Sequence, residues 1–114
     1  MKYLLLMYQN ESAMQKLPRE KASEVHAAFM AYVDAMNKAG VLIANHGLRP
    51  TSEATTVRAP NGKANVLDGP FAETKEQLAG YFLIDVADLD AALSWATRNP
   101  VAAHGAIEVR PVWA

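Results

Sequence analysis

The chain has 114 residues, of which 51% are hydrophobic and 20% charged, a make-up typical of one compact domain with a single core. It contains no cysteine, which excludes disulfides, thiolate metal sites and a cysteine nucleophile. The 11 basic and 12 acidic side chains give a net charge of -1 without a basic block, which argues against nucleic acid, polyanions and membrane surfaces as partners.

The first predicted element is a strand over residues 3–8, which read Tyr-Leu-Leu-Leu-Met-Tyr. Because apolar side chains occupy both alternating faces, this strand is expected to be covered on both sides. The apolar run is too short for the hydrophobic region of a signal peptide, and no later run reaches the length of a membrane span. We therefore expect a cytoplasmic protein without a membrane partner.

The clearest helix begins at Pro18, after the polar residues 9–15. Apolar side chains recur there at helical spacing, at Val25, Phe29, Tyr32, Val33 and Met36. Pro18 suits the first turn, where its missing N–H is no loss, and Gly40 suits the left-handed residue that follows a helix. Residues 41–44 predict the next strand.

A hairpin is predicted over residues 55–67, where the Asn61-Gly62 pair separates two short strands. These two residue types tolerate the positive φ values that tight hairpin turns require. After a polar connection, residues 81–86 are rich in aromatic and β-branched side chains and predict a further strand.

A second helix is predicted from Asp88, whose carboxylate can cap it, to Asn99, because Pro100 follows. Residues 106–112 predict the last strand. The resulting order contains the split β-α-β plan of the ferredoxin-like fold. We therefore expect a single α+β domain over residues 1–114, in which two helices cover one face of an antiparallel sheet and the hairpin is added to the middle of the plan.

The second face of this sheet needs a cover. Residues 3–8 and 81–84 are apolar on both faces, although two helices can cover only one of them. The simplest cover is the same face of a second copy, in a two-fold symmetric contact. We therefore predict a homodimer whose sheets face each other; the alternative is that the C-terminal tail or the hairpin folds over this face.

Residues 68–80 read DGPFAETKEQLAG and are followed by the strand sequence YFLID. This segment closely resembles the signature of the DGPF group of YCII-related proteins. Further similarities lie along nearly the whole chain, in the opening MKYLLLMY, the helix exit AGVL, the segments TTVR and DLDAA, and the ending IEVRPV. The resemblance implies a dimeric α+β barrel, the architecture that the strand faces favour independently. Most members of this group have no established activity.

The wider YCII family is associated with a histidine on the first helix and an aspartate in an Asp-Pro pair after the second, proposed as an acid–base dyad. Here Phe29 stands near the histidine position, one turn from His26, and Asn99 stands at the aspartate position before Pro100. An amide cannot exchange a proton as a carboxylate does, so the dyad is not intact. The dehydrochlorination of chlorinated, hydroxylated aromatic rings that the resemblance suggests is correspondingly disfavoured.

Three histidines are candidates for acid–base chemistry, because an imidazole titrates near neutral pH. His26, at the margin of the helical stripe, is either a partly buried, hydrogen-bonded residue or a general base. His46, at the end of the second strand, points either into a barrel mouth or into solvent. His104 is interpreted as a loop residue. No two histidines stand at i and i+2 or i and i+4, so no metal site is expected.

Glu108 and Arg110 share one face of the last strand, opposite Ile107 and Val109. If the helices cover the apolar face, this charged pair points into the space between the two sheets of the dimer. Because enclosed charges need partners, the pair forms either a salt bridge or an anchor for a small anion. Arg58, on the hairpin, is either a second ligand contact or an exposed residue.

Residues 68–71, Asp-Gly-Pro-Phe, predict a turn. Asp68 can accept hydrogen bonds from N–H groups two residues on, and Phe71 can plug an apolar gap. The functional alternative places Asp68 at the rim of a cleft, opposite a basic group.

The first functional hypothesis is an enzyme that moves protons on a hydroxylated or cyclic substrate. His26 or His46 is then the base, Asp68 an orienting carboxylate and Arg110 the anchor for an anionic oxygen. No cofactor is expected for this chemistry. The chain has neither a glycine-rich phosphate loop nor a nucleophile elbow, which argues against nucleotide-dependent transfer and against serine hydrolysis.

Two non-catalytic hypotheses stand beside the enzyme. One is a ligand-binding or accessory regulatory module, because members of the DGPF group often resemble genomic neighbours of extracytoplasmic-function sigma factors. The other is a dimer whose barrel is filled and which acts only through its surface.

Overall fold

The computed structural model describes residues 1–113, and its helices and strands follow the predicted order. The strands are β1 (Lys2–Gln9), β2 (Leu42–Gly47), β3 (Thr55–Arg58), β4 (Asn65–Asp68), β5 (Gln77–Asp85) and β6 (Ala106–Pro111). The helices are α1 (Glu11–Gln15), α2 (Arg19–Lys38) and α3 (Leu89–Arg98), and the short 3₁₀ turns are η1 (Thr51–Glu53), η2 (Pro60–Gly62) and η3 (Pro100–Ala103).

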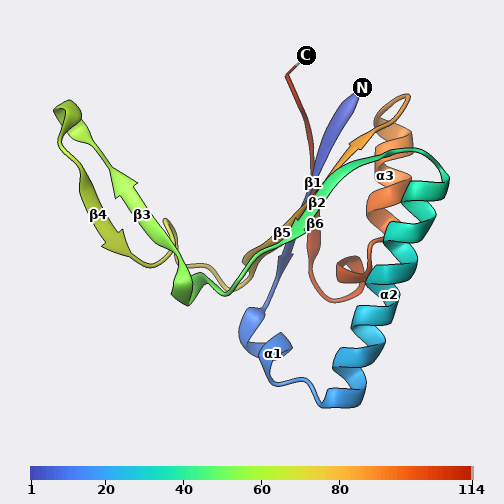
Figure 1. Ribbon diagram of the computed structural model, residues 1–114, viewed down its shortest axis with the longest axis horizontal. Coiled ribbons are helices and arrows are strands. Elements are labelled where there is room, and N and C mark those ends of the chain that lie inside the picture. The colour runs from blue at the N-terminus through green and yellow to red at the C-terminus, as the bar shows by residue number, and fades with distance from the viewer. Residues whose placement is uncertain (114) are drawn as a thin grey trace.

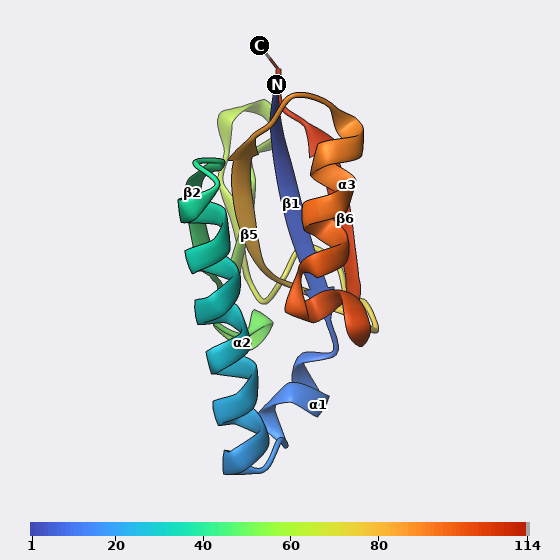
Figure 2. The same ribbon diagram turned by 90° about the vertical axis from the view of Figure 1, so that its right-hand side faces the viewer.

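Strands β2, β5, β1 and β6 form an antiparallel sheet in that spatial order. Helices α2 and α3 lie side by side on one face of this sheet (Figure 1, Figure 2). The arrangement is the split β-α-β plan of the ferredoxin-like fold, so the predicted fold class is confirmed. No helix within residues 1–113 is long and apolar enough to cross a membrane.

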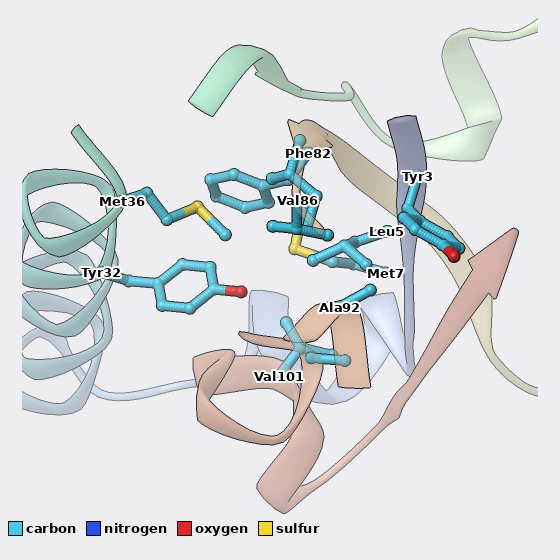
Figure 3. Packing of buried hydrophobic residues seen from close by; sticks show 11 residues of the cluster. Tyr3, Leu5, Met7, Tyr32, Met36, Phe82, Val86, Ala92 and Val101 are labelled. Atoms are coloured by element: carbon cyan, nitrogen blue, oxygen red, sulfur yellow. The ribbon is translucent and has the colours of Figure 1, made fainter. Parts of the chain in front are cut away.

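The hydrophobic core lies between the sheet and the two long helices (Figure 3). Tyr3, Leu5 and Met7 of the central strand β1 are buried in this layer. Phe82 and Ile84 of β5 are buried beside them. The helices and η3 complete this layer with Tyr32, Met36, Ala92, Ala96 and Val101. Because full burial of one large apolar side chain contributes about 1.5–3 kcal/mol, this layer is the main source of stability.

Local sequence signals set the ends of most elements as predicted. Gly40 follows helix α2 with a φ of 71°, in the left-handed region that glycine favours. The Asp88 side chain accepts a hydrogen bond from the Ala91 N–H at 2.9 Å and caps α3. In the hairpin turn, Asn61 and Gly62 have φ values of 56° and 78°.

Helix α1 is an addition to the predicted elements. Residues 9–15 are mostly polar and show no apolar periodicity, so the sequence does not predict a helix there. The helix has only five residues and buries none of them, so it forms without an apolar stripe. Its start is fixed locally, because the Asn10 side chain accepts a hydrogen bond from the Ala13 N–H at 2.9 Å. Strand β5 also begins at Gln77, before the apolar run from which a strand is predicted.

The β3–β4 hairpin stands away from the rest of the chain (Figure 1). Its strands form a separate two-stranded sheet and lean outward on the side opposite the helices. The radius of gyration is accordingly 16.0 Å, against about 13 Å for a compact chain of this length. At the other end, the Trp113 side chain is 99% exposed. Neither the hairpin nor the C-terminal residues through Trp113 therefore cover the second face of the sheet.

A hydrogen bond inside the core ties α2 to α3. The Tyr32 hydroxyl donates to the Trp95 carbonyl oxygen at 2.7 Å, and its ring meets the Phe82 ring edge-on. Burial raises the pKa of Tyr32 to about 12, an effect that the Asn99 amide and the Arg98 charge oppose only in part.

Tyr32→Phe removes this hydrogen bond and the titrating hydroxyl together. Below pH 10 we expect the substitution to lower the free energy of unfolding by about 1 kcal/mol, the usual net value of one hydrogen bond. The pKa of tyrosine is about 10 in the unfolded chain, and the pKa of Tyr32 in the folded protein is about 12. The wild type therefore loses its extra free energy of unfolding over the variant as the pH rises from 10 toward 12. Urea denaturation of both proteins below and above pH 10 measures the difference, and a constant difference would contradict the assignment.

Candidate functional site

The sheet face opposite the helices, here called the open face, is the main candidate site. It consists of the strand side chains that alternate with the core residues: Leu4, Leu6, Tyr8, Ala44, His46, Tyr81, Leu83, Glu108 and Arg110. The strand register aligns eight of them in two rows across the sheet, His46-Tyr81-Leu6-Glu108 and Ala44-Leu83-Leu4-Arg110. The centre of the open face is therefore apolar, and its polar groups lie toward its two edges.

A histidine–tyrosine pair occupies the β2 side of the open face. The Tyr81 hydroxyl lies 2.8 Å from Nδ1 of His46, and the two ring centroids are 5.7 Å apart. A neutral His46 either accepts this hydrogen bond at Nδ1 with its proton on Nε2, or donates it from Nδ1 and leaves Nε2 free, whereas a protonated His46 donates to the tyrosine oxygen. The pair can therefore pass a proton in either direction, which is the requirement for acid–base chemistry on a bound hydroxyl group.

An ion pair occupies the β6 edge of the open face. Arg110 donates through Nη2 to the Glu108 carboxylate, and the two side chains are 66% and 40% exposed. The salt-bridge alternative for these residues is thus present within one chain. An exposed pair of this kind stabilises the fold by at most about 1 kcal/mol. The guanidinium has five N–H donors, so Arg110 keeps donors for a second, anionic partner.

The two polar pairs do not converge within one chain. His46 and Glu108 stand in the same row but are separated by Tyr81 and Leu6 on the intervening strands. Three strand spacings of about 4.8 Å place them about 14 Å apart. A small ligand held by His46 therefore reaches the arginine of its own chain only with difficulty, whereas a second sheet packed on the open face brings further groups near.

The structure does not bring His26 and Asp68 together. His26 is exposed on α2, so the expected partial burial is wrong: the stripe that this helix turns to the sheet ends beside it. Asp68 is exposed at the end of β4. The helix and the hairpin lie on opposite sides of the sheet (Figure 1), because the hairpin forms its own small sheet and does not fold back.

The hairpin also places Arg58 and Phe71 away from the open face of their own chain. Phe71 is 73% exposed, so the expectation that it plugs an apolar gap is wrong within the described chain. The Arg58 guanidinium lies over its ring, 5.0 Å from the centroid. The chain does bend here: Gly69 has a φ of 110°, and its N–H donates to the Ala54 carbonyl oxygen. The hydrogen bond expected from Asp68 is wrong, because the residue two positions on is Pro70, which has no N–H.

The two positions of the family dyad hold packing residues. Phe29 is partly buried against the core. Asn99 is 2% exposed, and its Oδ1 accepts a hydrogen bond from the Val101 N–H at 2.9 Å, which caps η3. Its Nδ2 is buried without a partner in hydrogen-bond geometry. Neither residue offers an ionisable group, so these two positions supply no acid–base pair in this chain.

Helix α1 lines two cavities for which the sequence offered no signal. A polar cavity of about 440 Å³ lies between α1, η1 and residues 70–77, where the Glu11 carboxylate accepts hydrogen bonds from the Thr51 N–H and hydroxyl. An apolar cavity of about 390 Å³ lies between α1, the start of α2 and His104, whose Nε2 lies 3.0 Å from the Gln9 side-chain oxygen. Asn10, a capping residue type, is the one local sign of the helix that forms them.

Gly80 determines how closely β2 approaches β5 beside the histidine–tyrosine pair. A Cβ atom on Gly80 would lie 2.6 Å from the His46 carbonyl oxygen and 2.9 Å from the Met7 methyl group. We expect Gly80→Ala to lower the free energy of unfolding by about 1–3 kcal/mol. Gly47→Ala is the matched control, because nothing lies within 4 Å of its added Cβ. Urea denaturation compares the two, and equal losses of stability would contradict the close approach.

The fold and the full length of the chain agree with one known family. The profile of the YCII-related domain matches residues 1–114. The chain is also 41% identical over 114 residues to an uncharacterised protein of Rhizobium meliloti (strain 1021), in an alignment that covers 98% of this chain and 92% of that protein. The sheet, the helices and the hairpin all fall within both matches. The chain therefore belongs to the YCII-related family.

Proposed function

We propose that the protein is a homodimer joined through the open face and that the space between the two sheets binds a small anionic or phenolic ligand. The observation that carries this proposal is the hydrogen-bonded His46–Tyr81 pair beside an apolar strip that nothing in residues 1–113 covers. A phenol or an oxyanion suits such a site, since it combines an apolar body with an oxygen that exchanges hydrogen bonds or a proton. The cytoplasmic location stays a prediction from the sequence.

The need to bring the two polar pairs together favours one orientation of the two sheets. A two-fold axis that runs along the strands reverses their order, so that the His46 side of one sheet faces the Arg110 edge of the other. An in-plane axis across the strands would instead set each strand against its own copy, so that the β6 edges meet each other and His46 lies far from the Glu108–Arg110 pair of the partner. With sheets about 10 Å apart, the first orientation sets His46 and Tyr81 of one protomer opposite the Glu108–Arg110 ion pair of its partner, so that one ligand can contact His46, Tyr81 and the partner's Arg110.

Within this site each group has a defined task. Arg110 anchors the anionic oxygen, and Tyr81 donates a hydrogen bond to the ligand or to His46. When His46 donates from Nδ1 to the Tyr81 oxygen, its free Nε2 accepts the proton of a ligand hydroxyl. The leucines of the open face exclude water from the pair.

A non-catalytic ligand-binding module is the second candidate. One observation favours it: at the two positions of the family dyad, Phe29 packs against the core and Asn99 caps η3, so neither residue is available for acid–base catalysis. The two candidates share the same site and differ in whether the ligand leaves changed.

Ligand-induced stabilisation tests the site. A screen of small anions and phenols should raise the Tm of the wild type, because a ligand at a hundred times its Kd adds about 2.7 kcal/mol to stability. Arg110→Ala and His46→Gln should each remove most of this shift, whereas His26→Ala, on the outer surface of α2, should keep it. No shift with any compound would favour the filled barrel. Mass spectrometry of the bound compound separates catalysis from binding.

Mixed dimers test whether the two protomers share one site. His46→Gln and Arg110→Ala chains, each unable to bind, should regain binding when mixed, because one of the two sites in a mixed dimer then has both residues intact. Random pairing makes about half of the dimers mixed, so calorimetric titration should recover about a quarter of the wild-type sites. Recovery of none would show that each site belongs to a single chain.

A further inference from the structure

The β3–β4 hairpin with the turn that follows it, residues 55–71, is here called the arm. Four of its large apolar side chains are more than half exposed to solvent: Val57 (59% exposed), Val66 (58%), Leu67 (58%) and Phe71 (73%). Val57 and Val66 are directly paired and share one face of the arm, while Leu67 points to the other. Both faces of the arm are thus suited to contact with another surface.

Residues 1–113 offer the arm no such surface. Its strands pair only with each other, and they diverge from the main sheet (Figure 1). Its root is fixed by the hydrogen bonds from Gly69 N–H to the Ala54 carbonyl oxygen and from the Thr56 hydroxyl to the Gly69 carbonyl oxygen, both at 2.7 Å. An isolated two-stranded hairpin is marginal in water, so a defined arm of this kind needs a partner surface.

The open face alone is too small to form the interface of the proposed dimer. Four strands form the face, and at about 4.8 Å between strands and about 3.3 Å per residue over about six residues its footprint is about 400 Å². A stable dimer of standard size buries about 800 Å² on each protomer. The open face therefore supplies about half of the area that the proposed dimer needs, and another surface of the same chain has to supply the rest.

We propose that the arm is a dimerisation clasp: each protomer packs its arm against the body of the second copy, and the arm and the open face together form one continuous interface. This inference rests on the proposed dimer. Two-fold symmetry covers both arms and both open faces in one assembly. The chain inserts the arm and its two connections between β2, which ends at Gly47 directly after His46, and β5, which begins at Gln77, four residues before Tyr81. The clasp therefore closes around the histidine–tyrosine pair, and the site is incomplete without the second copy.

Sedimentation equilibrium of serine variants tests the clasp. The arm variant replaces the four exposed apolar residues, Val57, Val66, Leu67 and Phe71, by serine. We expect the dissociation constant of the dimer to rise at least tenfold, while the circular dichroism spectrum keeps its helical signal because the core does not include the arm. Met30→Ser is the matched control, since Met30 is 60% exposed on α2 and lies away from both proposed contact surfaces.

Crosslinking provides a second measurement that does not depend on arm folding. The chain contains no cysteine, so Leu67→Cys creates a single attachment point for a photoreactive maleimide. In dimers of ¹⁴N-labelled and ¹⁵N-labelled chains, we expect crosslinks between light and heavy chains, and far fewer from a Met30→Cys control.

The possible results separate the two proposals. If the wild type is a dimer, crosslinks confined to one chain or an unchanged dissociation constant in the arm variant overturn the clasp and leave the open-face dimer standing. A wild type that stays monomeric at the concentration of the crosslinking experiment overturns both. Light–heavy crosslinks together with a weakened arm variant support both.

Discussion

Covering both faces of a central antiparallel sheet is the constraint on which the rest of this structure depends. Leu5 of β1 is fully buried under the helices, whereas Leu4 and Leu6 are half-buried on the other side. Two helices cover one face of a four-stranded sheet and no more. The apolar residues of the open face therefore gain their full hydrophobic stabilisation only when another surface removes them from water.

The same constraint explains where the polar side chains of the open face lie. Polar side chains lie toward the two edges of the open face, because its centre is made of leucines from β1 and β5. His46 with Tyr81 on one side and Arg110 on the other are separated by intervening strands, so a single chain offers two half-sites. In the proposed dimer each half-site meets its complement, which couples ligand binding to assembly.

The residues at the two positions of the family dyad stabilise the fold in this chain. Asn99 caps η3 from a buried position, and the neighbouring Tyr32 joins α2 to α3 through the Trp95 carbonyl oxygen. These contacts stabilise the helical layer at the side of the sheet away from the open face. The proposed ligand site on the open face is thus separate from this layer, and the arm, which the chain inserts between β2 and β5, is the element best placed to enclose it.

The sequence by itself determined the fold class, the caps at Gly40 and Asp88 and the apolar character of both faces of β1, because periodicity and capping act over a few neighbouring residues. It also placed Glu108 and Arg110 on one face, since alternation along a strand is local. Only the tertiary structure decided that His46 meets Tyr81, that His26 and Asp68 lie on opposite sides of the sheet and that the hairpin projects as an arm. Strand register and hairpin direction depend on contacts between residues far apart in the chain, which no local pattern specifies.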